Sequence, residues 1–181
     1  MYQMKGDIKM SNYEVRAAKF ASLLVRLFEG CATLDDFEYA IDEYNSTHSR
    51  PLIYAHGVSR IAILRADYVI KFNLAPDENW DDGYGNCRAG DNITERAVYE
   101  RAVADGYAYL LAKTTVLAIG GRDVSIMPRV NGVNNECRYW GDYVTDEEYD
   151  WLTENVCDIH DGNVGYYKGK PVVIDYGWDG Q

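Results

Sequence analysis

The spacing of apolar residues changes part-way along the chain, and this change limits the possible folds. In the first fifth, apolar residues recur three and four positions apart, the spacing of amphipathic helices. Two helices are expected there: one over residues 17–28 with Gly30 as its stop, and one capped by Thr33 or Asp35. From residue 52 onward, short β-prone runs alternate with single helices. This order predicts an α+β fold that begins with a helical hairpin.

Local patterns also place the later elements. Strands are expected over residues 52–54, 61–64, 68–72, 115–119, 124–127, 164–167 and 171–174. Helices are expected over 92–106 and 146–156, and a Thr-Asp-Glu-Glu capping box begins at Thr145. The polar segment 45–51 is predicted to be a connection, and the segment 75–90, rich in glycine and acids, a mobile loop.

The charge balance limits the partners. The chain has 181 residues, enough for one domain with a full core. Its 18 basic and 29 acidic residues give a net charge of −11, whereas a duplex-binding module needs a clustered basic face. No direct binding of nucleic acid is therefore expected. The excess of acids leaves room for a basic partner, for a divalent metal or for imitation of nucleic-acid charge.

The expected compartment is the cytoplasm. Residues 1–10 do not form a signal peptide, because no apolar run follows their charges. The longest apolar stretch, 20–28, is interrupted by Ser22 and Arg26, so no membrane partner is expected. The four cysteines show no metal-like or CxxC spacing. The oligomeric state is left open.

One C-terminal segment places groups that carry chemistry close together. Asp158 and Asn163 lie five positions apart in a loop between a helix and a strand, and Asp175 follows an apolar strand. Two carboxylates and an amide can converge there as oxygen ligands for a hard cation such as Mg²⁺, with one carboxylate left to accept a proton. Taken singly, each of these residues can also be a turn residue or a solvated cap.

These residues resemble known motifs. The run Asp-Ile-His-Asp-Gly-Asn from Asp158, with Ile-Asp-Tyr-Gly around Asp175, resembles the catalytic loop and metal-binding motif of the protein-kinase-like fold. The form is similar to that of aminoglycoside and other small-molecule kinases and of short phage kinase-like proteins. Upstream, Tyr-Val-Ile-Lys-Phe around Lys71 resembles the third-strand lysine motif, and Glu95 stands where the helix glutamate belongs. Residues 126–130 fall at the adenine-contacting hinge.

The resemblance implies catalytic and metal-binding roles. Lys71 would hold the α- and β-phosphates of ATP, positioned by Glu95. Asp158 would orient or deprotonate the acceptor hydroxyl. Asn163 and Asp175 would bind Mg²⁺.

The resemblance also implies nucleotide contacts, with open points. Gly57 and Ser59 would cover the phosphates and Met127 would lie at the hinge, although segment 55–60 keeps one glycine of the usual glycine-rich loop. Glu100 competes with Glu95 as the partner of Lys71. His160 fits the motif and can equally be a hydrogen-bonded loop histidine.

The resemblance covers residues 52–178 and implies a minimal kinase-like fold with a small antiparallel N-lobe sheet. Residues 1–50 would form an extra helical hairpin packed on the core, and 51–181 the kinase-like core. That core would divide into an N-lobe at 51–127 and a truncated C-lobe at 128–181, without an activation segment or peptide-docking helices. In one reading the hairpin replaces the missing helical lobe.

Two functions follow. One is an ATP- and Mg²⁺-dependent phosphotransferase acting on serine or threonine of a protein, itself included, with a small-molecule acceptor as a variant. The other is a catalytically weak, acidic kinase-like protein that binds and inhibits a host protein, as a phage-type inhibitor or nucleic-acid mimic. Residues 142–161 favour the second, with eight acids and no Lys or Arg.

Overall fold

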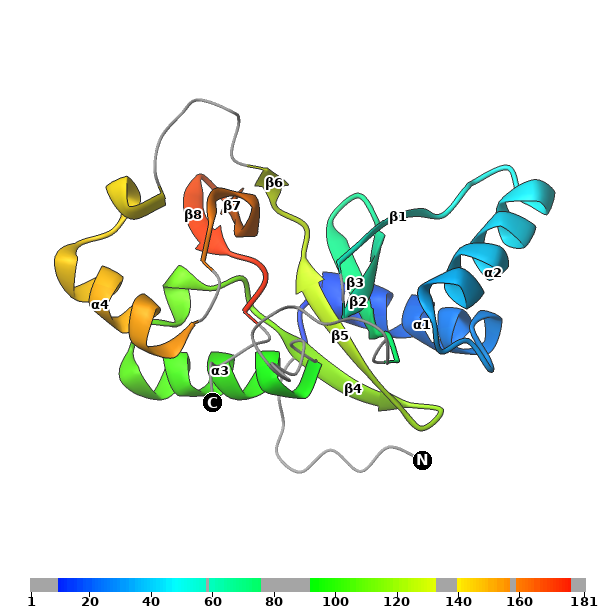
Figure 1. Ribbon diagram of the computed structural model, residues 1–181, viewed down its shortest axis with the longest axis horizontal. Coiled ribbons are helices and arrows are strands. Elements are labelled where there is room, and N and C mark those ends of the chain that lie inside the picture. Colours follow the sequence, from blue (N-terminus) through cyan, green and yellow to red (C-terminus); the bar gives the residue numbers. More distant parts are fainter. Residues whose placement is uncertain (1–9, 58, 76–91, 133–139, 157–158, 177–181) are drawn as a thin grey trace, which may run out of the picture.

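The computed structural model describes residues 10–57, 59–75, 92–132, 140–156 and 159–176. Its helices are α1 (Asn12–Leu27), α2 (Leu34–Thr47), α3 (Asn92–Asp105) and α4 (Asp146–Asn155). Its strands are β1 (Ile53–His56), β2 (Arg60–Leu64), β3 (Tyr68–Asn73), β4 (Thr115–Ile119), β5 (Arg122–Pro128), β6 (Asn131–Gly132), β7 (Val164–Tyr167) and β8 (Lys170–Val173). Short 3₁₀ turns lie at Ala108–Leu110, Trp140–Tyr143 and Asp161–Asn163. The predicted α+β class is confirmed (Figure 1).

The strands form two antiparallel sheets. The larger sheet has the order β1-β2-β3-β5-β4, and the smaller has the order β6-β7-β8. Tight turns join β4 to β5 and β7 to β8, and in each turn both central residues have positive φ, as type I′ hairpins require. All seven predicted strands are present. The two-residue β6 was not predicted, because so short a strand has no readable alternation.

Capping boxes start three of the helices. Ser11 caps α1, Thr145 caps α4, and Thr33, rather than Asp35, caps α2. The prediction of a connection at 45–51 is wrong in part, because α2 continues to Thr47. The side chain of Asn45, still within the helix, then brackets the backbone of Leu52 with hydrogen bonds of 2.7 and 3.2 Å.

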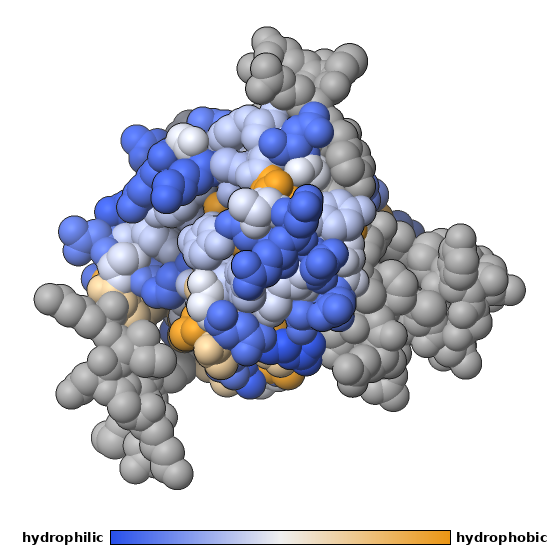
Figure 2. Space-filling model, turned by 90° about the vertical axis from the view of Figure 1, so that its left-hand side faces the viewer, coloured by the Kyte–Doolittle hydropathy of each residue, from blue (hydrophilic) through white to orange (hydrophobic). Residues whose placement is uncertain are grey.

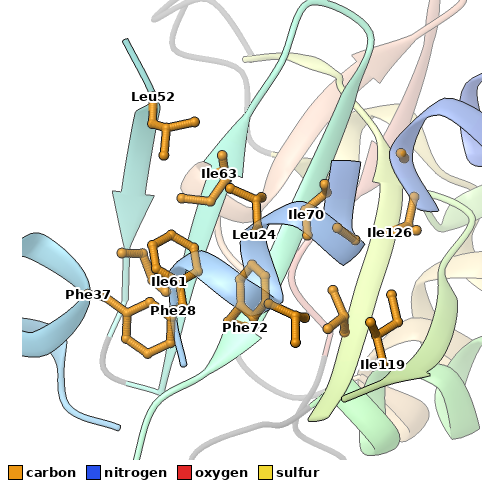
Figure 3. Packing of buried hydrophobic residues seen from close by; sticks show 14 of the residues in the cluster. Leu24, Phe28, Phe37, Leu52, Ile61, Ile63, Ile70, Phe72, Ile119 and Ile126 are labelled. Atoms are coloured by element: carbon orange, nitrogen blue, oxygen red, sulfur yellow. The ribbon is translucent and has the colours of Figure 1, made fainter. Parts of the chain in front are cut away.

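The larger sheet and the first two helices share one apolar core. Leu24 and Phe28 from the α1 region and Phe37 of α2 pack on inward-facing residues of β2 and β3 such as Ile61 and Phe72 (Figure 3). The rings of Phe28, Phe37 and Phe72 lie 4.9–5.9 Å apart between centroids, at tilted or edge-on angles that favour aromatic pairing.

A second core joins the remaining elements. Its fully or nearly buried members come from α3, the 3₁₀ turn after it, β5, α4 and the β7–β8 pair, with residues next to these elements: Val98, Ala102, Leu110, Leu111, Met127, Trp151, Leu152, Val156, Val164, Val173 and Tyr176. The large sheet lies between this part and the α1–α2 pair (Figure 1). The buried residues of α1 and α2 thus belong to the core of the sheet, which disagrees with the reading in which the hairpin replaces a missing helical lobe.

The outer face of the α4 end is mostly hydrophilic (Figure 2). Among the described residues, no helix has both the length and the apolar composition needed to cross a bilayer. The predicted loop at 75–90 lies almost wholly outside the described residues, so that prediction stays open.

Candidate functional site

Three charged residues far apart in the sequence meet where β3, α3 and the end of β8 come together. Lys71 Nζ on β3 lies 2.7 Å from Glu95 Oε1 on α3 and donates to the carbonyl oxygen of Ile174 at 2.8 Å. The same nitrogen is 3.8 Å from Asp175 Oδ1. The structure therefore brings Lys71, Glu95 and Asp175 into one cluster.

Glu95 is the buried centre of this cluster. Its side chain is 0% exposed, and its Oε2 accepts hydrogen bonds from Thr114 Oγ1 at 3.1 Å and Ser125 Oγ at 3.0 Å. Ser125 lies on β5 directly opposite Lys71 on β3. Both carboxylate oxygens are thus engaged, as a buried charge requires. Glu100, the competing candidate, is 71% exposed and lies near Arg96, so Glu95 is the partner of Lys71.

The start of α3 is anchored to the large sheet by Asn92. Its side-chain amide donates to the carbonyl oxygens of Lys71 at 3.0 Å and Asp123 at 2.8 Å, while its backbone N–H donates to Asn73 Oδ1 at 3.1 Å. Asn92 and Glu95 are three positions apart on the buried face of the helix. The anchor therefore sets the depth at which Glu95 meets Lys71.

Burial and neighbouring charges shift the pKa values of both Lys71 and Glu95. Burial, reinforced by the nearby positive charge of Arg60, lowers the pKa of Lys71 to about 8. Burial alone would raise the pKa of Glu95, but Lys71 and Arg60 attract the carboxylate and keep its pKa below the ordinary value. At neutral pH the pair is ionised, and Lys71 has the positive charge that phosphate recognition requires.

Arg60 is a member of the cluster that the sequence patterns did not reveal. Its Nη1 lies 3.0 Å from Glu95 Oε1, and its Nη2 contacts Asp175 Oδ1. An arginine at the start of an apolar strand is usually an exposed strand end, so no local pattern identified Arg60 as a site residue. Two cationic side chains of the chain itself, Arg60 and Lys71, therefore stand beside Asp175.

The β7–β8 ladder holds the backbone of Asn163 opposite Ile174, the residue before Asp175. The N–H of Ile174 donates to the carbonyl oxygen of Asn163 at 2.9 Å, which continues the register in which Val164 faces Val173. The Asp175 side chain is 49% exposed. A carboxylate and an amide at neighbouring strand ends suit Mg²⁺, which binds through one or two carboxylates together with substrate phosphates. Within the described ranges there is no group of three or more His, Cys, Asp or Glu side chains suited to a metal.

The remaining predicted site residues have mixed outcomes. Gly57 and Ser59 lie in the turn between β1 and β2, where the Gly57 N–H donates to the Arg60 carbonyl oxygen at 2.9 Å. Met127 lies on β5 opposite Val69, and its side chain is buried in the second core. Asp158 lies outside the described residues, so its role stays a prediction.

Two neighbours fix the backbone around these residues. The Tyr176 ring is buried in the second core and its hydroxyl donates to the carbonyl oxygen of Ala112, which anchors the residue after Asp175. Burial raises the pKa of Tyr176 well above its ordinary value, so the hydroxyl keeps its proton. In the loop before β7, the N–H of Gly162 donates to Nδ1 of His160 at 3.0 Å, the contact expected of a loop histidine.

Comparisons with known proteins give little. No protein-family model matches the chain, and no curated protein matches it. Among solved structures it is similar to WbdD, in a co-crystal structure with the kinase inhibitor LY294002, at 16% identity and a TM-score of 0.37. The match covers 71% of this chain and 33% of that one, so the chain spans about a third of the WbdD chain. This similarity carries no inference about activity, and the function proposed below rests on the site itself.

The cluster combines fixed cationic groups with a half-exposed carboxylate. One buried, fixed lysine faces a carboxylate that is half exposed at a strand end, with a second cation beside it. Cations held in fixed places stabilise charge that develops on a phosphoryl group without reorganisation.

Proposed function

We propose that the chain is a minimal protein-kinase-like phosphotransferase that uses ATP and Mg²⁺. The observation that carries this proposal is the buried Lys71–Glu95 pair, held 2.7 Å apart and directed at the end of β8 where Asp175 follows. The order of the motifs around residues 71, 95 and 175 suggested a common site, and the proximity of the three side chains supports that proposal.

The residues divide the task. Lys71 would bind the α- and β-phosphates, and Glu95 would keep the ammonium group of Lys71 in place. Asn163 and Asp175 would hold magnesium, which neutralises charge on the phosphates. As the acceptor oxygen bonds to the γ-phosphorus, the bond from that phosphorus to the β–γ bridging oxygen breaks and ADP leaves. The proton of the acceptor hydroxyl would pass to Asp158. We propose serine or threonine of a protein, including the chain itself, as the acceptor.

Binding is tested first by thermal denaturation with ATP, with Mg²⁺ and with both together. A ligand at 100 times its Kd stabilises by about 2.7 kcal/mol, or roughly 5–10 °C for a chain of this size. We expect a shift of that size with ATP and Mg²⁺ together and its loss in Lys71→Met. Lys19→Met, which removes an exposed lysine of α1, is the matched control and should behave as wild type.

Chemistry is tested by transfer of labelled γ-phosphate to the chain or to added proteins. Asp158→Ala should keep the thermal shift and lose the transfer, because its proposed role is in the chemical step. The proposal fails if wild-type protein shows no shift with ATP and Mg²⁺ together. That result would favour the acidic interaction protein, whose exposed acids on α4 include Asp146, Glu147, Asp150 and Glu154.

A further inference from the structure

Arg60 lies between the two carboxylates of the cluster with part of its hydrogen-bonding capacity unused. Its side chain is 7% exposed, Nη1 is 3.0 Å from Glu95 Oε1, and Nη2 contacts Asp175 Oδ1. Nη1 is buried and donates no hydrogen bond to any described residue. Nη1 is thus ion-paired with Glu95 without an aligned hydrogen bond, so a further acceptor would stabilise this buried nitrogen.

Glu95 does not depend on Arg60 for its partners. It has Lys71, Thr114 and Ser125, and those contacts use both of its oxygens. Asp175 is different, because it is half exposed and, among the described residues, its ionic contacts are with Arg60 and, at 3.8 Å, with Lys71. The contact between Arg60 and Asp175 is therefore the one that an incoming cation at Asp175 would displace.

The position of Arg60 in the chain points to phosphate. It follows the turn that carries Gly57 and Ser59, and its carbonyl oxygen accepts from the Gly57 N–H. Segment 55–60 has one glycine, so little backbone there is free to approach a phosphate closely. In a glycine-rich loop, backbone N–H groups donate hydrogen bonds to the phosphate oxygens. A guanidinium can replace them, because it offers five donors in a planar fork that matches phosphate oxygens.

Building on the proposed function, we propose that Arg60 is a phosphate-binding residue for the nucleoside triphosphate. In the nucleotide-free protein it pairs with Asp175. When Asp175 binds magnesium, the guanidinium is released and binds the terminal phosphates beside Lys71. Arg60 thus supplies donors that the shortened glycine-rich segment lacks, and it keeps Asp175 neutralised between turnovers.

Calorimetric titration with sodium tripolyphosphate tests this role without the adenine base, and adenosine serves as the second probe. We expect Arg60→Lys, which keeps the charge and loses the fork, to weaken tripolyphosphate binding in the presence of Mg²⁺ about tenfold. Arg60→Gln should weaken it at least as much, while both variants bind adenosine as wild type does. Arg16→Gln, which removes an exposed arginine paired with Asp67, is the matched control and should change neither affinity.

A second arm uses Asp175→Asn, which removes the carboxylate that competes for Arg60. Without Mg²⁺, this variant should bind tripolyphosphate more tightly than wild type, and the gain should vanish when Arg60→Gln is added. If Arg60→Gln does not fold, the tripolyphosphate affinities of Arg60→Lys and Asp175→Asn test the role of Arg60.

Wild-type affinity for tripolyphosphate in the Arg60 variants, with the ATP and Mg²⁺ thermal shift intact, would overturn the inference and leave the proposed function standing. A parallel loss of adenosine and tripolyphosphate binding would also overturn it, since that loss indicates a purely structural role. The absence of any shift in the wild-type protein would instead remove the proposed function.

Discussion

Replacement of Glu14 by glutamine tests whether a buried carboxylate ties the N-terminal helix to the rest of the molecule. Glu14 on α1 is 1% exposed, and its Oε1 lies 2.7 Å from both Lys113 Nζ and Thr115 Oγ1. Its Oε2 accepts from the Ser11 N–H at 2.7 Å. The next residue along from Lys113 is Thr114, which donates to Glu95 in the candidate site.

The size of the effect follows from the pKa. Burial alone would raise the pKa of Glu14, but hydrogen bonds from Lys113, Ser11 and Thr115 lower it from 4.5 to about 2. A depression of that size corresponds to roughly 3 kcal/mol of stability. Because the folded-state pKa is the lower one, this stability is fully present above pH 4.5 and is lost as the pH falls toward 2. Glu14→Gln should therefore lower Tm by about 6–12 °C at pH 7.

Urea denaturation at a series of pH values between 7 and 3 measures the difference in unfolding free energy between wild type and Glu14→Gln. The difference should be constant from pH 7 to about 5 and should shrink below pH 4.5. Glu43→Gln, at an exposed position of α2, is the matched control and should stay within about 0.5 kcal/mol of wild type. A wild type and Glu14→Gln that lose stability in parallel across the acid range would refute the reasoning.

Four further substitutions test other contacts. Glu95→Gln leaves Lys71 and Arg60 without their buried counter-charge and should cost about 3–5 kcal/mol in urea denaturation; a cost under 1 kcal/mol would show that the pair is not ionised. Gly120→Ala should cost about 2 kcal/mol, because φ is +58° and the added Cβ would lie 2.8 Å from Val25 Cγ1. Gly169→Ala, with positive φ and open space around it, should cost less, and equal losses would contradict the packing argument. Thr145→Ala removes the cap of α4 and should lower Tm by about 2–4 °C, whereas an unchanged Tm would show that the capping box contributes nothing.

Local sequence patterns placed most elements, because periodicity and capping are properties of short segments. Thr145 with its following acids marked the start of α4, and the β-prone runs at 115–119 and 124–127 marked β4 and β5. The end of α2 was missed because the polar residues near Asn45 have no pattern of their own, and the bonds of that side chain to Leu52 form only in the folded chain.

Only some residues of the candidate site could be predicted from the sequence. Lys71, Glu95 and Asp175 stand in motifs whose order suggested a common site. Thr114 and Ser125 are small polar residues within or beside apolar strands, and such residues look alike whether or not they face a carboxylate.

The sequence by itself determined the α+β order, the helix caps and the identity of the residues whose chemistry suits phosphate and magnesium. These follow from short-range spacing and residue type. Only the tertiary structure decided that Glu95 rather than Glu100 meets Lys71, that the N-terminal helices cover the large sheet, and that Arg60 stands against Asp175. The reason is physical: Arg60 and Asp175 are more than a hundred residues apart, one in the larger sheet and the other just after the smaller one, so their contact depends on how the sheets are placed, which no local pattern encodes.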